Sequence, residues 1–122
     1  MIINHDCIRD IILTIEDETT ASVPYILPNT LYNKFNGTYD EDVINYHIKF
    51  IYESNLVEKV SYASGFIPIR IWDLTPLGHQ YAANIRDNTI WNKLKGTISK
   101  FASISLPILI QKSSEIFLNT IS

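Results

Sequence analysis

The stretch DEDVINYHIKFIYESNLVEK, residues 40–59, decides the fold because a helical pattern changes to a strand pattern within it. Over residues 40–54 the apolar side chains recur at spacings of three and four, which is typical of a helix with one buried face. After Asn55 the spacing becomes two residues. We therefore predict a strand over 56–62 that returns, after a short turn, as a second strand over 66–74.

A helix followed at once by a two-stranded ribbon is the arrangement of a recognition helix and its wing. We predict an α+β, mainly α, winged helix-turn-helix-like domain over residues 1–95. A helix over 6–18, with isoleucines along one side, and a short strand near 29–35 are expected to precede the recognition helix. Residues 96–122 are predicted to form a C-terminal helical extension that packs on the core or forms a dimer interface.

The second half of the chain reads as mainly helical. Thr75 followed by Pro76 is a typical helix start. Apolar side chains, including Leu77 and Tyr81, continue the pattern until Gly96, which we expect to end the helix. Two further helices are predicted, over 97–104 and 105–122.

Composition places the chain among globular proteins of one domain. It has 122 residues, of which 46% are hydrophobic, enough to build a core. The single cysteine, Cys7, excludes an intrachain disulfide and fits a reducing, cytoplasmic setting. No signal peptide is visible, and the longest apolar run, at 106–110, is too short to span a bilayer, so no membrane partner is expected.

Charge is distributed unevenly along the chain. Residues 1–58 hold ten acidic and three basic side chains, whereas residues 59–122 hold seven basic and three acidic ones. The net charges of the two halves are therefore −7 and +4. This asymmetry fits either two solvated faces or the attraction of an anionic partner to the C-terminal half.

Five short motifs stand out together, and the resemblance that they support extends over nearly the whole chain: Ile8–Glu16, Tyr46–His47, Asn55–Val57, Leu74–His79 and Ile85–Lys93. In this combination they resemble the small phage and prophage proteins catalogued as domain of unknown function 2513. Asn55 stands where that family usually has glycine, and asparagine also tolerates the left-handed conformation that ends a helix. The resemblance implies a winged-helix-like fold and a mobile-element setting, and it implies no established activity.

The sequence offers little for catalysis or metal binding. His47 and His79 lie on different predicted helices, but a zinc site needs three or four ligands, and Cys7 and His5 show no ligand spacing. Structural roles are expected for both histidines, His47 beside the base of the wing and His79 bonded to a backbone or carboxylate group. Serine-histidine-aspartate order, a glycine-rich phosphate loop and paired cysteines are not found. We predict no enzyme, no cofactor and no metal.

Two functions stay open for the predicted recognition helix. In the first, a DNA-binding, transcription-regulator-like protein of phage or prophage type presents side chains to double-stranded DNA. Those expected in the major groove are Asn45, Tyr46 and Lys49, and those expected on the wing are Lys59 and Arg70. Residues 40–59, however, hold five acidic and two basic side chains, which disfavours contact with phosphates. In the second, the same fold is a non-enzymatic protein-interaction module, a homodimer or an adaptor for a host or phage protein.

A second candidate surface follows residue 85. Arg86 and Asp87 are expected to form an ion pair on the helix surface, to tie the helix to a neighbouring segment, or to belong to a binding surface. Trp91 is expected to be a core anchor or an interface residue. Phe117, in the apolar tail, is a candidate contact for a second subunit or another protein.

Overall fold

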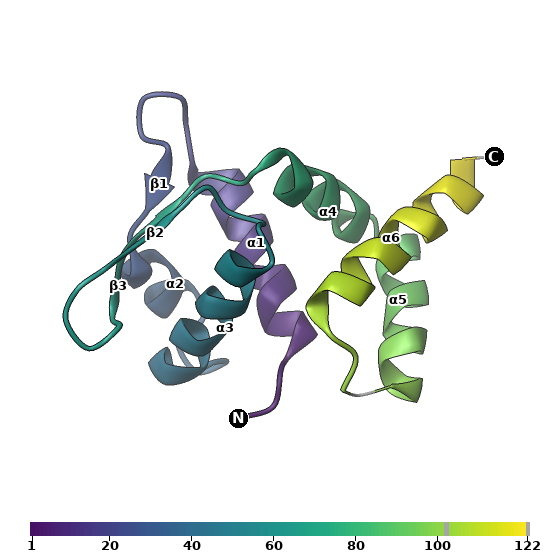
Figure 1. Ribbon diagram of the computed structural model, residues 1–122, viewed down its shortest axis with the longest axis horizontal. Coiled ribbons are helices and arrows are strands. Elements are labelled where there is room, and N and C mark those ends of the chain that lie inside the picture. The colour runs from purple at the N-terminus through teal and green to yellow at the C-terminus, as the bar shows by residue number, and fades with distance from the viewer. Residues whose placement is uncertain (102, 122) are drawn as a thin grey trace.

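The computed structural model describes residues 1–101 and 103–121 (Figure 1). Within them the chain forms α1 (His5–Glu18), β1 (Tyr25–Ile26), α2 (Pro28–Lys34), α3 (Glu41–Glu53), β2 (Val60–Tyr62), β3 (Pro68–Trp72), α4 (Pro76–Arg86), α5 (Asn88–Lys100) and α6 (Leu106–Ile121). The fold is α+β and mainly α, as predicted. Ala102 and Ser122, which belong to the predicted C-terminal extension, lie outside the described residues.

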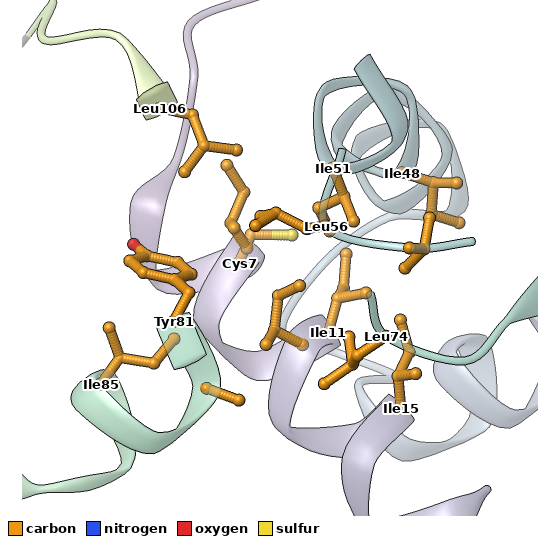
Figure 2. Packing of buried hydrophobic residues seen from close by; sticks show 14 of the residues in the cluster. Cys7, Ile11, Ile15, Ile48, Ile51, Leu56, Leu74, Tyr81, Ile85 and Leu106 are labelled. Atoms are coloured by element: carbon orange, nitrogen blue, oxygen red, sulfur yellow. The ribbon is translucent and has the colours of Figure 1, made fainter. Parts of the chain in front are cut away.

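The core is arranged around α1. Its isoleucine stripe, Ile8, Ile11, Ile12 and Ile15, is completely buried. Asn4 caps the start of the helix, because its side chain accepts the backbone N–H of Cys7. Figure 2 shows side chains of α1 packed between α3 and α4, with Ile48 and Ile51 on one side and Tyr81 and Ile85 on the other. Each such isoleucine contributes roughly 1.5–3 kcal/mol by its burial, so this helix holds the fold together.

The sheet has three antiparallel strands in the order β1-β3-β2. Next to the pair Ser61–Arg70, Tyr62 pairs with Pro68, so Ile69 is an extra residue in β3 and forms a bulge. Pro68 is the first residue of β3 and lies directly beside this bulge, where a proline without an N–H is tolerated. The bulge interrupts the alternation of side chains, so Ile67 and Ile69 are exposed and only Ile71 is buried. Regular alternation over the predicted strand 66–74 would place these three isoleucines on one face, and the bulge prevents it.

The end of α3 is a tight left-handed turn. Asn55 has a φ of 61°, and its N–H donates to the carbonyl of Tyr52 at 3.0 Å. The N–H of Leu56 donates to the carbonyl of Ile51 at 3.1 Å. This pair of hydrogen bonds satisfies the last carbonyl groups of the helix, and asparagine takes the place usually filled by glycine, as predicted.

The first turn of α4 lies directly on the end of α3. Thr75 is the N-cap, as predicted, and its hydroxyl donates to the carbonyl of Asn55 at 2.6 Å while accepting the N–H of Gly78 at 3.0 Å. The N–H of Thr75 donates to the carbonyl of Leu56 at 3.0 Å. A Cβ atom on Gly78 would lie 2.0 Å from that same carbonyl oxygen, so glycine is required. We call these four residues the α3–α4 junction.

Residues 29–35 do not form the predicted strand. Residues 29–34 belong to α2, which begins at Pro28 and buries Leu31, and Phe35 is the C-cap of this helix. Proline suits the first position of a helix because its φ is already helical and its missing N–H has no partner to lose there. That start signal is stronger than the weak alternation of this short segment.

The long helix predicted over 74–95 is two helices. Asp87 has an extended backbone (φ −71°, ψ 120°), and its carboxylate caps α5 by accepting the N–H of Ile90 at 3.0 Å. Gly96 lies inside α5, so the predicted helix end there was wrong. Leu77, expected to continue the buried pattern, is exposed in the first turn of α4.

The C-terminal helix packs on the core. Leu106, Leu109 and Ile110 are buried where α6 crosses α4 and α5. Phe117 is half-buried against the same cluster. Because α5 continues through residue 100, it crosses the predicted boundary between residues 95 and 96.

We predict that Gly78→Ala lowers the free energy of unfolding by about 2 kcal/mol, because the new methyl group overlaps a backbone carbonyl that cannot move without opening the junction. Gly96→Ala is the matched control. It places the same methyl group in another helix with nothing within 4 Å, and we expect it to stabilise the protein by roughly 0.5–1 kcal/mol. Urea unfolding measures both, and equal effects of the two substitutions would contradict the account of the junction.

Candidate functional site

A groove of about 590 Å³ lies between the exposed face of α3 and the β2–β3 hairpin. Its walls are Asn45, Tyr46, Lys49, Tyr52 and Glu53 from α3, and Tyr62 and Phe66 from the hairpin. The α3 residues share one face because they follow one another at helical spacings. We call this site the α3–hairpin groove.

The hairpin turn holds an aromatic side chain in an unusual conformation. Gly65 and Phe66 both have positive φ, at 83° and 62°, and the N–H of Ala63 closes the turn on the carbonyl of Ile67 at 2.8 Å. A left-handed conformation costs a residue with a side chain roughly 1–2 kcal/mol, so it is rare for phenylalanine. The side chain of Phe66 is nevertheless 87% exposed, so burial does not compensate for this cost.

The surface around the groove is acidic. Asp40, Glu41 and Asp42 are exposed at the N-terminal end of α3. Inside the groove, Lys49 and Glu53 face each other at 3.9 Å, and both are more than half exposed, so this pair is weak. Negative charge at the start of α3 is favourable for the helix dipole and unfavourable for an approaching phosphate.

Three of the five residues predicted to bind DNA meet in this groove. The side-chain oxygen of Asn45 accepts the hydroxyl of Tyr32. Tyr46 donates its hydroxyl to the carbonyl of Met1 at 3.2 Å and packs edge-on against Phe50. Lys49 is exposed. Asn45 and Tyr46 thus form hydrogen bonds within the protein. Of these three residues, Lys49 has only the weak ion pair with Glu53.

The two predicted wing residues do not line the groove. The guanidinium of Arg70 lies 4.5 Å from the ring centre of Tyr25, on the outer face of the sheet. Lys59 lines a separate shallow pocket with Trp72. The tip of the hairpin instead carries Phe66.

Sequence reasoning missed Tyr62 and Phe66 as groove residues. The bulge in β3 changes which strand residues face outward, and no regular alternation reveals it. One signal was available in the sequence, because Gly65 marks the turn of the hairpin and Phe66 directly follows it.

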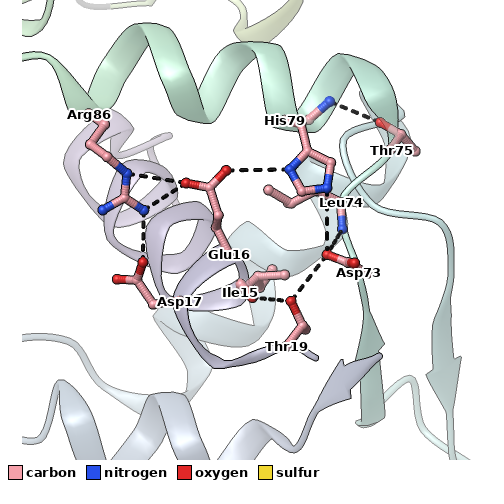
Figure 3. A network of polar contacts seen from close by, with 10 residues as sticks. Ile15, Glu16, Asp17, Thr19, Asp73, Leu74, Thr75, His79 and Arg86 are labelled. Atoms are coloured by element: carbon pink, nitrogen blue, oxygen red, sulfur yellow. Dashed lines mark hydrogen bonds and ion pairs between the residues drawn. The ribbon is translucent and has the colours of Figure 1, made fainter. Parts of the chain in front are cut away.

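In the second candidate surface, Arg86 joins two helices. Figure 3 shows Arg86 tying α4 to the end of α1, with its guanidinium 2.8 Å from Glu16 and 2.9 Å from Asp17. These carboxylates raise the pKa of Arg86, chiefly through the hydrogen bond to Glu16. Of the predicted roles for Arg86, the tie to a neighbouring segment is the one seen. His79 reaches the same Glu16 at 3.4 Å, and thus bonds a carboxylate as expected.

Asp87 and Trp91 have separate roles. Asp87 caps α5 and forms no pair with Arg86. Trp91 is buried, and the guanidinium of Arg9 lies 5.0 Å from the centre of the tryptophan ring. The Nε–H of Arg9 donates to the carbonyl of Ile85. Trp91 is therefore a core anchor, one of the two roles considered for it.

His47 is fully buried and is held as a neutral ring. Its Nε2 accepts the N–H of Asn4 at 2.7 Å, so its Nδ1–H donates to the carbonyl of Val43, also at 2.7 Å. Burial lowers the pKa of His47, although the hydrogen bond to Val43 opposes this change. Burial also lowers the pKa of His5, whose Nε2–H donates to the carbonyl of Ile104. Both rings join separate parts of the chain.

The described residues, 1–101 and 103–121, hold neither a metal-binding cluster nor a membrane-spanning helix. No group of three or more histidine, cysteine or acidic side chains in these residues is arranged to hold a metal ion. No helix in this part of the chain has the length and apolar character needed to cross a membrane.

The order α1-β1-α2-α3-β2-β3 and the groove beside α3 define a small, mainly helical α+β protein with a projecting β-hairpin. The chain belongs to the family described as "Hypothetical protein (DUF2513)", whose model matches residues 3–105, so the resemblance is confirmed. It is similar to an uncharacterized protein of Haemophilus influenzae (strain ATCC 51907 / DSM 11121 / KW20 / Rd). The two are 34% identical over 115 residues, which cover 93% of this chain and 92% of the relative. No solved structure matches.

We predict that stability decreases in mild acid because of the neutral histidines. The folded-state pKa of His47 lies below the usual 6.5, so its contribution is fully present above pH 6.5 and is lost as the pH falls through the lowered pKa. The free energy of unfolding should fall by up to about 1.4 kcal/mol per pH unit for each such histidine. Urea unfolding between about pH 7.5 and pH 5 measures this slope. His47→Gln should reduce the slope, and an unchanged slope in this variant would contradict the assignment.

Proposed function

We propose that the protein is a non-enzymatic interaction protein of the winged-helix type, which holds a segment of another protein in the α3–hairpin groove. The observation that carries this proposal is the gathering of four aromatic side chains, Tyr46, Tyr52, Tyr62 and Phe66, around one groove. Aromatic residues are enriched at the centres of protein interfaces, where they supply most of the binding energy.

The charge around the groove supports a protein partner over DNA. Acidic side chains stand at the leading end of α3, and the hairpin turn over residues 63–67 carries no basic residue. Non-specific affinity for DNA comes mainly from cations placed on phosphates. An apolar side chain flanked by lysine or arginine would complement both the aromatic walls and the acidic surround.

The backbone of Phe66 gives a second, independent support. Backbone strain of this kind persists where the surrounding structure imposes it, and such sites are often functional. Because Phe66 is exposed and conformationally unfavourable, folding alone does not explain it. Contact with a partner would bury the ring and give the strained turn a role.

A DNA-binding regulator is the second candidate. The element order α1-β1-α2-α3-β2-β3 favours it, because this order presents α3 next to a hairpin, as in a recognition helix beside a wing. Lys49 is exposed on that helix. The phage or prophage setting implied by the family resemblance stays a prediction for either function.

Selection from a displayed library of random peptides tests the first candidate. We expect wild-type protein to enrich peptides with an aromatic or aliphatic side chain flanked by lysine or arginine. Phe66→Gly and Tyr52→Ala should each weaken binding of the selected peptides at least roughly tenfold, as expected for central interface aromatics. Leu77→Ala is the matched control, because Leu77 is also an exposed apolar residue but lies on α4, and it should have no effect.

Phe66→Gly also separates binding from folding. Glycine adopts a positive φ without strain, so this variant should be as stable as wild type or up to about 1 kcal/mol more stable in urea. Peptides that bind wild type and Phe66→Gly equally well would contradict the proposed site.

Fluorescence anisotropy with a labelled random DNA duplex tests the second candidate. We expect no salt-sensitive binding of DNA, because the surroundings of the groove are acidic. Such binding would be measurable at about 50 mM salt and would fall steeply by about 200 mM. Binding with that salt dependence, and its loss in Lys49→Glu but not in Lys100→Glu, would instead establish α3 as a DNA-reading helix.

A further inference from the structure

The last helix, α6, has apolar side chains on two faces. One face, with Leu106, Leu109 and Ile110, is buried on the core. On the opposite face Ile108 is 56% exposed and Leu118 is 59% exposed. In Figure 1 the last turns of α6 extend past α5 at the edge of the molecule. The single chain therefore leaves an apolar helix end uncovered.

A second groove lies at the other end of the same helix. It has a volume of about 710 Å³ and is lined by Thr97, Phe101, Ser103, Ile104, Ile108 and Lys112. Phe101 is itself exposed. We call it the α5–α6 groove. One end of α6 thus presents an exposed apolar knob, Leu118, and the other end presents an apolar groove.

The exposed face of α6 is complementary, in its order of apolar and charged residues, to the same face of a second, antiparallel copy. Four residues at helical spacing run along it in the order apolar, basic, acidic, apolar: Ile108, Lys112, Glu115 and Leu118. Read backwards, the order is apolar, acidic, basic, apolar. Two antiparallel copies of the helix, related by a twofold axis near residue 113, would therefore place Ile108 against Leu118 of the other copy, and Lys112 against its Glu115.

The charges favour this direction over a parallel one. A parallel pair would bring Lys112 near Lys112 of the second copy and Glu115 near Glu115, and such contacts repel. Within one chain Lys112 and Glu115 lie 3.7 Å apart and are both half exposed, so they are free to turn toward a second copy. Twofold pairing is also the commonest symmetry of protein assemblies.

We propose that the protein forms a homodimer in which α6 pairs antiparallel with α6 of a second copy, and that the Leu118 end of each helix occupies the α5–α6 groove of the other. This interface is separate from the α3–hairpin groove, which lies on other elements, so the two proposals fail independently.

Sedimentation equilibrium tests the dimer. Over about 1–200 μM protein we expect the apparent mass to approach twice the 14.0 kDa of one chain. Leu118→Asp should weaken the dimer at least roughly tenfold, because the contact occurs twice. Ile67→Asp, at a similarly exposed apolar residue of the hairpin, is the control and should leave the dimer intact. A wild-type monomer throughout, or a dimer unaffected by Leu118→Asp, would overturn the proposal.

Charge reversal and crosslinking test the direction of the pair. Lys112→Glu and Glu115→Lys should each weaken the dimer, and the double variant should restore it. The double variant Ile108→Cys with Leu118→Cys should form disulfide-linked dimers. The two positions lie about 15 Å apart along one helix, too far for a bond within a chain. Disulfide-linked dimers of Leu118→Cys alone would indicate a parallel pair and overturn the antiparallel arrangement.

Discussion

The approach of the first turn of α4 to the carbonyl of Leu56 is the contact on which the rest of the structure depends. It brings the end of α3 and the start of α4 to one point, and only Gly78 leaves room for it. The chain between these two ends has to leave and return at the same place, so it forms the β2–β3 hairpin. At the base of the hairpin, Val57 pairs with Leu74 and the N–H of Glu58 donates to the carbonyl of Asp73. The α3–hairpin groove is a consequence of this geometry.

Much of the family resemblance is explained by contacts of α1 with α4 and α5. Arg9 reaches Ile85 and Trp91, while Glu16 receives both Arg86 and His79 (Figure 3). These residues come from three of the motifs that led to the family. The motifs therefore describe mainly how α1 is held, whereas the groove is lined mostly by residues outside them.

The sequence predicted the elements that carry strong local signals. Asn55 and Thr75 were read correctly because a helix end and a helix start depend on a few neighbouring residues. The break at Asp87 was missed because the apolar pattern continues across it, and only the cap of α5 shows the change. The candidate site was half predicted: helical spacing identifies Asn45, Tyr46 and Lys49, but the hairpin wall depends on a bulge that arises from strand pairing.

The central claim is that the α3–hairpin groove contacts another protein. The most direct test is to place a photo-reactive benzoylphenylalanine in living cells at position 66 in one variant and at position 77 in another. The account predicts a crosslinked product at position 66 that protease removes and nuclease does not, with no such product at position 77. Product that nuclease removes, or the same products from both positions, would contradict it.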